Sequence, residues 1–204
     1  GADVSDDWGY EIESGVFTLD LNGHTLKADQ SYALTLKNAG TVVTLTDTAA
    51  GGKVTTGDGS VAVFAGSSGK VVINGGSYSG SYSLSVRSGG IAEIKAGTFT
   101  LYSRIGRTIF VDDTSSLTIT GGTFTAGFSS LYTKGTTTIT GGTFANGNAT
   151  DFGGNFYNQG TLKISNATIK DGIATNTAKR NARGGNISNT AALTITDSTL
   201  SGGQ

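Results

Sequence analysis

The carboxylates and the single histidine of this sequence do not form a pattern typical of a catalytic centre. Asp112 and Asp113 are the one adjacent carboxylate pair outside the N-terminal segment, and His24 follows Gly23. Cleavage of a glycosidic bond needs two carboxylates facing one cleft, and a metal-dependent lyase needs clustered carboxylates and a base. Neighbours on a strand point to opposite faces, so Asp113 is expected inside and Asp112 outside. We expect a non-catalytic protein with no cofactor or metal, in which His24 is a turn residue. A polysaccharide lyase or glycosidase is an alternative function.

A second group of side chains is suited to binding. On the third strand of each repeat, alternation places Arg87, Asp112, Tyr132 and Tyr157 one above another on the outward face, with Phe64 and Phe110 two residues earlier on the same face. Aromatic rings beside charged hydrogen-bonding groups suit a sugar ring or an extended glycan. The alternative is that a loop or the N-terminal segment covers these rings.

A third group consists of outward threonines on another strand of the repeat. Its members are Thr98, Thr100, Thr123, Thr125 and Thr143. Threonines about 7 Å apart along a strand and about 4.8 Å apart between strands form a flat array of the kind that ice-binding solenoids present. Threonine is also a common residue on strand surfaces, and the row continues with Lys170. Ice binding is therefore an alternative function.

The elements that must position these side chains are repeats. Apolar anchors recur every 20 to 31 residues, at Leu21, Leu45, Ile73, Ile94, Ile119, Ile139, Ile164 and Ile195. Copies such as SLTITGGTFT (116–125) and TTTITGGTFA (136–145) alternate apolar and polar residues with a period of two. This pattern predicts an all-β, right-handed parallel β-helix, or β-solenoid, of about eight coils with three short strands per coil. We expect residues 174–183 to form a loop.

Three further columns of residues define the expected register. The second inward position lies five residues after the anchor, at Leu26, Tyr78, Phe99, Phe124, Phe144, Ile169 and Leu200, while the coil of Leu45 has Ala50 there and a Gly51-Gly52 insertion. The third strand is expected to point Ala65, Val86, Val111, Leu131, Phe156 and Ile187 inward. Two residues later comes an expected inward polar column of Ser67, Ser88, Asp113, Thr133, Asn158 and Asn189, which would hydrogen-bond between coils.

Two late repeats carry a family resemblance. The runs GGNFYNQGTLKISNAT (153–168) and GGNISNTAALTITDST (184–199) resemble the GG-x-[aromatic or aliphatic]-x-N repeat of bacterial surface β-helix proteins, including the chlamydial polymorphic outer-membrane adhesin type. LDLNGHTL (19–26) and the GGTFT units resemble the β-helix modules of large bacterial surface proteins with a pectin-lyase-like fold. The resemblance implies a secreted or surface-displayed module for adhesion or surface structure.

Composition limits the partners. A formal charge of -1, with scattered Lys and Arg, disfavours nucleic acid and anionic membranes. No apolar run approaches the roughly 20 residues of a membrane span. We expect residues 1–15 to be a capping or interaction segment and 16–204 to be the β-helix. The expected partner is a host or environmental glycan or a surface protein, outside the cell or on its surface. End-to-end association of copies into a filament is an alternative, because the ends of a solenoid expose unpaired strands.

Overall fold

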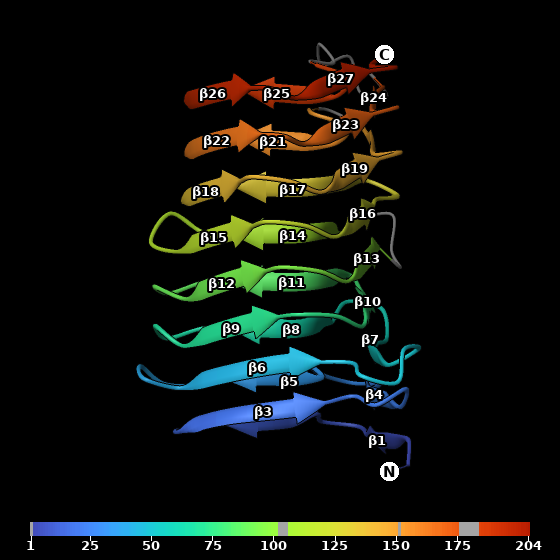
Figure 1. Ribbon diagram of the computed structural model, residues 1–204, viewed down its shortest axis with the longest axis vertical. Coiled ribbons are helices and arrows are strands. Elements are labelled where there is room, and N and C mark those ends of the chain that lie inside the picture. Colours follow the sequence, from blue (N-terminus) through green and yellow to red (C-terminus); the bar gives the residue numbers. More distant parts are fainter. Residues whose placement is uncertain (1, 102–105, 151, 176–183) are drawn as a thin grey trace.

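The computed structural model describes residues 2–101, 106–150, 152–175 and 184–204. Within them the chain forms a parallel β-solenoid without a helix, and the predicted fold class is confirmed. In Figure 1 the strands of one sheet run from left to right at the front, the chain turns back at the right, and the strands behind run to the left while the chain rises towards its C-terminus. This is a right-handed coil. Most of the expected loop at 174–183 lies outside the described residues.

Three parallel sheets run along the solenoid axis. Sheet A has nine strands: β1 (Val4–Asp6), β4 (Thr25–Ala28), β7 (Lys53–Thr56), β10 (Ser77–Gly80), β13 (Thr98–Leu101), β16 (Thr123–Thr125), β19 (Thr143–Ala145), β23 (Thr168–Lys170) and β27 (Thr199–Ser201). Sheet B has eight: β2 (Tyr10–Ile12), β5 (Leu34–Leu36), β8 (Val61–Ala65), β11 (Tyr82–Val86), β14 (Arg107–Val111), β17 (Ser129–Thr133), β21 (Phe156–Asn158) and β25 (Ile187–Asn189). Sheet C has eight: β3 (Val16–Asp20), β6 (Val42–Thr46), β9 (Lys70–Ile73), β12 (Ile91–Ile94), β15 (Ser116–Ile119), β18 (Thr136–Ile139), β22 (Thr161–Ser165) and β26 (Ala192–Thr196). A short pair, β20 (Asn148–Ala149) and β24 (Ile173–Ala174), lies beside them.

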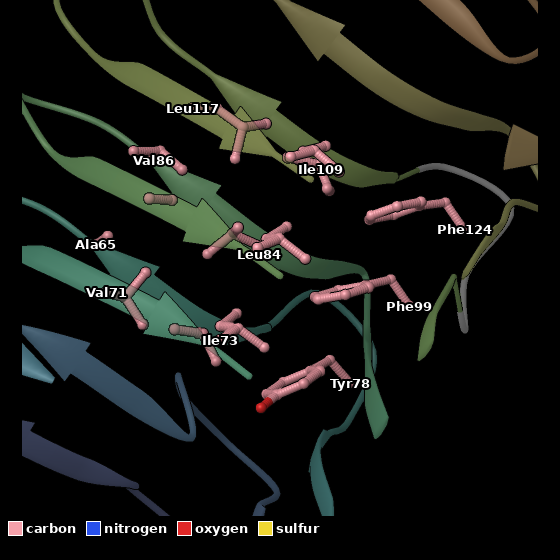
Figure 2. Packing of buried hydrophobic residues seen from close by; sticks show 14 of the residues in the cluster. Ala65, Val71, Ile73, Tyr78, Leu84, Val86, Phe99, Ile109, Leu117 and Phe124 are labelled. Atoms are coloured by element: carbon pink, nitrogen blue, oxygen red, sulfur yellow. The ribbon is translucent and has the colours of Figure 1, made fainter. Parts of the chain in front are cut away.

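Equivalent side chains of successive coils lie over one another in a continuous apolar interior. In sheet A, Tyr78, Phe99, Phe124 and Phe144 are in register and fully buried. Their rings stack with centroid separations of 5.0, 4.9 and 4.4 Å. Figure 2 shows the first three rings of this stack beside the aliphatic side chains of sheets B and C. The Gly-Gly corners bend the chain between sheets C and A, and Gly122 adopts a φ of 103° that favours glycine.

The first two coils differ from the predicted register. Leu45 pairs with Leu19 and not with Leu21, and Val54, not Ala50, takes the second inward position above Leu26. Leu21 is buried beyond the end of its strand, and Ala50 lies in an exposed turn. These coils have longer corners than the GGTFT coils, so a fixed spacing of five residues does not apply to them.

The predicted third inward column is a mixture of two columns. Val86 and Val111 are in register with Thr133 and Asn158, whereas Leu84 and Ile109 are in register with Leu131 and Phe156. Early coils fill both inward positions with apolar residues, so alternation alone does not reveal a slip of two residues.

The predicted polar column is correct only in the later coils. Thr133 and Asn158 are fully buried, and Asn189 follows them in register at the end of the solenoid. Ser67, Ser88 and Asp113 instead lie in exposed turns. The two buried polar members have hydrogen-bond partners, because Thr133 bonds to the Thr137 hydroxyl and Asn158 bonds to Asn189.

The GGN motif has a structural role in the last coils. The Asn155 amide nitrogen donates to the Oδ1 of Asn186 at 2.8 Å, and the Asn158 amide nitrogen donates to the Oδ1 of Asn189 at 2.6 Å. A Cβ at Gly153, where φ is 54°, would overlap the carbonyl oxygen of Phe156. The motif therefore forms two asparagine ladders with the glycine-dependent turn that positions them.

The N-terminal segment contributes the first strand of sheet A and of sheet B. β1 pairs with β4, and β2 pairs with β5, while Tyr10 and Ile12 pack against the core. No described residue adds a strand to sheet C at this end, and Val16 is therefore 77% exposed and Phe17 47% exposed. Residues 2–15 therefore cover only part of the first coil.

The ring stack generates a stability prediction. Phe124→Ala removes a fully buried ring that touches rings on both sides, and we expect the free energy of unfolding to fall by about 3–5 kcal/mol. Phe17→Ala is the matched control, and we expect a much smaller loss there. Urea unfolding of both variants measures the difference, and similar losses would contradict the described packing.

Tyr78 generates a prediction for alkaline pH. Burial, together with the charge of Asp47, raises the pKa of the Tyr78 phenol, whose hydroxyl donates to the carbonyl oxygen of Gly75 at 2.8 Å. Above about pH 10 the unfolded chain loses this proton while the folded chain keeps it. The free energy of unfolding is therefore unaffected by this group below that pH and falls as the pH rises above it. We expect Tyr78→Phe to be less stable near neutral pH but to lose less stability from about pH 8 to about pH 11. Urea unfolding at the two pH values checks this, and an unchanged loss would refute it.

Candidate functional site

A row of aromatic side chains lies on the outer face of sheet B. Phe64, Phe110, Tyr132 and Tyr157 share one outward row, with Ser85 between Phe64 and Phe110. Four neighbours complete the set: Tyr32 stacks on Phe64, Tyr82 meets Phe110 edge-on, Phe152 stacks on Tyr157, and Phe128 lies beside Arg107. These eight residues form what we call the aromatic ladder. Except for Tyr32, which is 38% exposed, they are half-buried.

The structure separates the predicted binding residues into two rows. Arg87 and Asp112 belong to the next outward row, which continues to Lys134, because the amide of Asp112 bonds the carbonyl of Val86 and that of Lys134 bonds the carbonyl of Val111. Phe64 and Phe110 lie two residues before that row, as predicted, but Tyr132 and Tyr157 share their row and not the row of Arg87 and Asp112. The prediction was thus correct about the face and wrong by two residues about the register.

The rings of the ladder cover one another's faces. Tyr132 and Tyr157 are 4.8 Å apart between ring centroids with an interplanar angle of 18°, and Phe152 stacks on Tyr157 at 5.1 Å. Parallel rings this close cannot lie side by side in one plane, so their faces overlap. These two tyrosine rings therefore do not present open faces on which a sugar ring could lie.

Cationic side chains fill the remaining positions around the rings. The Arg87 guanidinium lies 4.5 Å from the Phe110 centroid, and its Nε donates to the Ser85 hydroxyl at 2.9 Å. It thus occupies the place where the row lacks a ring. Arg107 lies 4.4 Å from the Phe128 centroid, and the Lys134 ammonium lies 5.7 Å from the Tyr132 centroid. These separations are typical of cation–π contacts.

Gln159 connects the two tyrosine hydroxyls. The Tyr132 hydroxyl donates to Gln159 Oε1 at 2.6 Å, and Gln159 Nε2 donates to the Tyr157 hydroxyl at 2.6 Å. Burial, and to a lesser degree the charge of Tyr132, raises the pKa of the Tyr157 phenol. Tyr157 therefore keeps a hydroxyl hydrogen that it can donate to a ligand.

Asp112 stabilises a turn of the solenoid. Its carboxylate accepts the amide hydrogen of Ser88 from the preceding coil at 2.7 Å and the amide and hydroxyl hydrogens of Thr114 at 3.2 and 3.0 Å. Partial burial by itself would raise the pKa of Asp112, but hydrogen bonding by the Ser115 side chain, together with that of Ser88 and Thr114, outweighs it and the pKa is lowered. We conclude that Asp112 stabilises the turn, and its oxygens are already engaged there.

A polar hollow adjoins the ladder at Phe128. It has a volume of about 530 Å³, and its lining consists of Gly127, Phe128, Asn146, Asn148, Thr150 and Thr175. Amide and hydroxyl groups beside an aromatic ring are suited to hydrogen-bonding the hydroxyl groups of a sugar. The repeat pattern does not indicate this hollow, because its residues come from loops and from the short β20 strand.

The predicted threonine rows are in register. Thr98 pairs with Thr123 and Thr123 with Thr143, and Thr100 pairs with Thr125, which is followed by Ala145. A further row on sheet C was missed, in which Thr118 and Thr138 are aligned. Charged residues interrupt both surfaces, with Glu93 next to Thr118, Lys163 next to Thr138, and Lys53 and Lys170 on sheet A.

The candidate catalytic residues are dispersed. Asp113 lies in an exposed turn and does not face inward as predicted, while the Nδ1 of His24 lies 3.5 Å from a carboxylate oxygen of Asp3. Among the described residues, no group of three or more His, Cys, Asp or Glu side chains is arranged to hold a metal ion. The same part of the chain contains no helix that is long and apolar enough to cross a membrane.

The fold and the ladder define the class as a parallel β-solenoid repeat protein with an aromatic outer face. The chain has no significant match among protein-family models, curated proteins or solved structures. The resemblance to bacterial surface adhesins therefore rests on the sequence motifs alone.

The turn role of Asp112 can be tested at acid pH. Because its pKa is lowered on folding, its contribution to stability is present above about pH 4, the unfolded value, and is lost as the pH falls through the folded value. We expect Asp112→Asn to reduce the acid-induced loss of stability between about pH 6 and about pH 3. Asp113→Asn is the control, because the Asp113 carboxylate accepts no hydrogen bond from a described residue. Equal effects of the two substitutions in urea unfolding would argue against this role.

Proposed function

We propose that this protein is a non-catalytic β-solenoid module of the extracellular space or cell surface that binds an extended glycan along the aromatic ladder. The observation that carries the proposal is the alignment of Phe64, Phe110, Tyr132 and Tyr157 in one outward row of sheet B. Contiguous half-exposed aromatic residues on a soluble protein mark interaction surfaces more often than scattered ones do.

The chemistry along this face supports a glycan as the ligand. Guanidinium, ammonium, amide and phenol groups accompany the rings, so the face combines apolar surface with many hydrogen-bond donors. The hollow beside Phe128 adds the side chains of Asn146 and Asn148. A chain of sugar residues presents a repeating series of hydroxyl groups, which suits a surface that itself repeats from coil to coil.

The proposed location rests on the repeat motifs. GGN and GGTFT units resemble those of secreted and surface-displayed β-helix proteins. A rigid rod with one binding face is suited to adhesion, because the ligand can contact several coils at once.

Substitution of the tyrosine pair tests the proposal. The parent protein is first screened on an array of neutral and acidic oligosaccharides. We expect the Tyr132→Ala/Tyr157→Ala double variant to bind the retained glycans at least about tenfold more weakly, because central aromatic residues dominate binding energies. Trp8→Ala is the matched control, since Trp8 is 74% exposed and lies outside the ladder.

Circular dichroism and urea unfolding establish that both variants are folded. Retention of full binding by the tyrosine variant, or absence of any bound glycan with the parent protein, would contradict the proposed function.

A further inference from the structure

The orientation of the ladder rings indicates what kind of glycan they contact. This step rests on the function proposed above. Tyr157 stacks on both Tyr132 and Phe152, and the Arg87 guanidinium lies over the Phe110 ring. Because neighbours cover these faces, the parts of the rings left for a ligand are mainly their edges. The edge of an aromatic ring carries partial positive charge, whereas its face carries partial negative charge.

The charges of Arg87 and Lys134 add to the partial positive charge of the ring edges. Arg87 and Lys134 form no ion pair with a described carboxylate, and the Nη atoms of Arg87 have no hydrogen-bond partner among the described residues. The nearest carboxylate in their row, Asp112, directs its oxygens to the amides of Ser88 and Thr114. The Nη atoms of Arg87 and the ammonium group of Lys134 therefore remain as cationic hydrogen-bond donors for a ligand.

From these observations we infer that the ladder binds an acidic glycan, whose carboxylate or sulfate groups contact Arg87 and Lys134 while its sugar rings lie along the aromatic edges. Arg87 and Lys134 stand two coils apart in one row, which corresponds to about 10 Å along the axis. This separation is close to the length of one disaccharide unit in an extended glycan. An anionic group on every second sugar would thus meet a cation at both positions.

Matched oligosaccharides test the inference. Isothermal titration with a galacturonate hexamer is compared with the same hexamer after reduction of its carboxyl groups to alcohols, and a heparin hexasaccharide provides the sulfate arm. We expect an acidic hexamer to bind at least about tenfold more tightly than the reduced one, and added salt to weaken this binding by screening.

Charge variants locate the effect on the ladder. We expect Arg87→Gln/Lys134→Gln to lower the affinity for the acidic hexamer about tenfold, because each partly exposed ion pair contributes a factor of about three. Lys95→Gln/Lys163→Gln removes the same charge outside the ladder, because Lys163 is in β22 of sheet C and Lys95 directly follows β12. This variant serves as the control, with an expected loss of less than about twofold.

Each result separates the inference from the function on which it rests. Equal binding of the acidic and reduced hexamers, with loss in the tyrosine variant, would overturn the acidic ligand and leave glycan binding standing. Equal losses in the two charge variants would overturn the assignment to Arg87 and Lys134. Failure of every acidic and neutral oligosaccharide to bind would overturn both proposals.

Discussion

Parallel pairing of each coil with the next is the constraint on which the rest of the structure depends. Backbone hydrogen bonds hold successive coils about 4.8 Å apart, so any side chain at an equivalent position lies directly over its counterpart. Thr123 thus lies between Thr98 and Thr143, and Phe124 lies between Phe99 and Phe144. A single outward substitution adds to or interrupts a whole row, and the character of each face results from rows and not from individual residues.

Inside the solenoid this constraint favours side chains that stack well on themselves. Flat rings do so in the stack of Tyr78, Phe99, Phe124 and Phe144, where apolar contact accompanies the hydrogen bonding of the backbone. Asparagine does so through its amide, which can donate to one neighbour and accept from another, as Asn155 and Asn158 do. The last coils therefore contain buried polar groups that are matched with partners, and both kinds of column maintain the register.

Outside the solenoid the same stacking gives the three faces different chemistry. Sheets A and C present mainly threonine, serine and lysine, whereas sheet B presents the aromatic ladder with Arg87, Arg107 and Lys134 beside it. In the ladder the rings contact each other, so the surface available to a ligand consists of ring edges, cations and phenol groups. A chain of anionic sugars complements such a surface better than a neutral apolar ligand does.

The sequence by itself determined the solenoid and the faces of most side chains, because period-two alternation and the GGTFT corners are local features. It also indicated that Tyr132 and Tyr157 point outward from neighbouring coils. Register was decided only by the tertiary structure, since Val86 and Leu84 are both apolar and inward and alternation does not distinguish them. The tertiary structure also decided that Asp112 stabilises a turn, because its carboxylate accepts the amide hydrogen of Ser88 from the preceding coil. It likewise decided that Arg87 covers the Phe110 ring. These contacts join residues more than 20 positions apart, and their geometry depends on the length of each intervening turn.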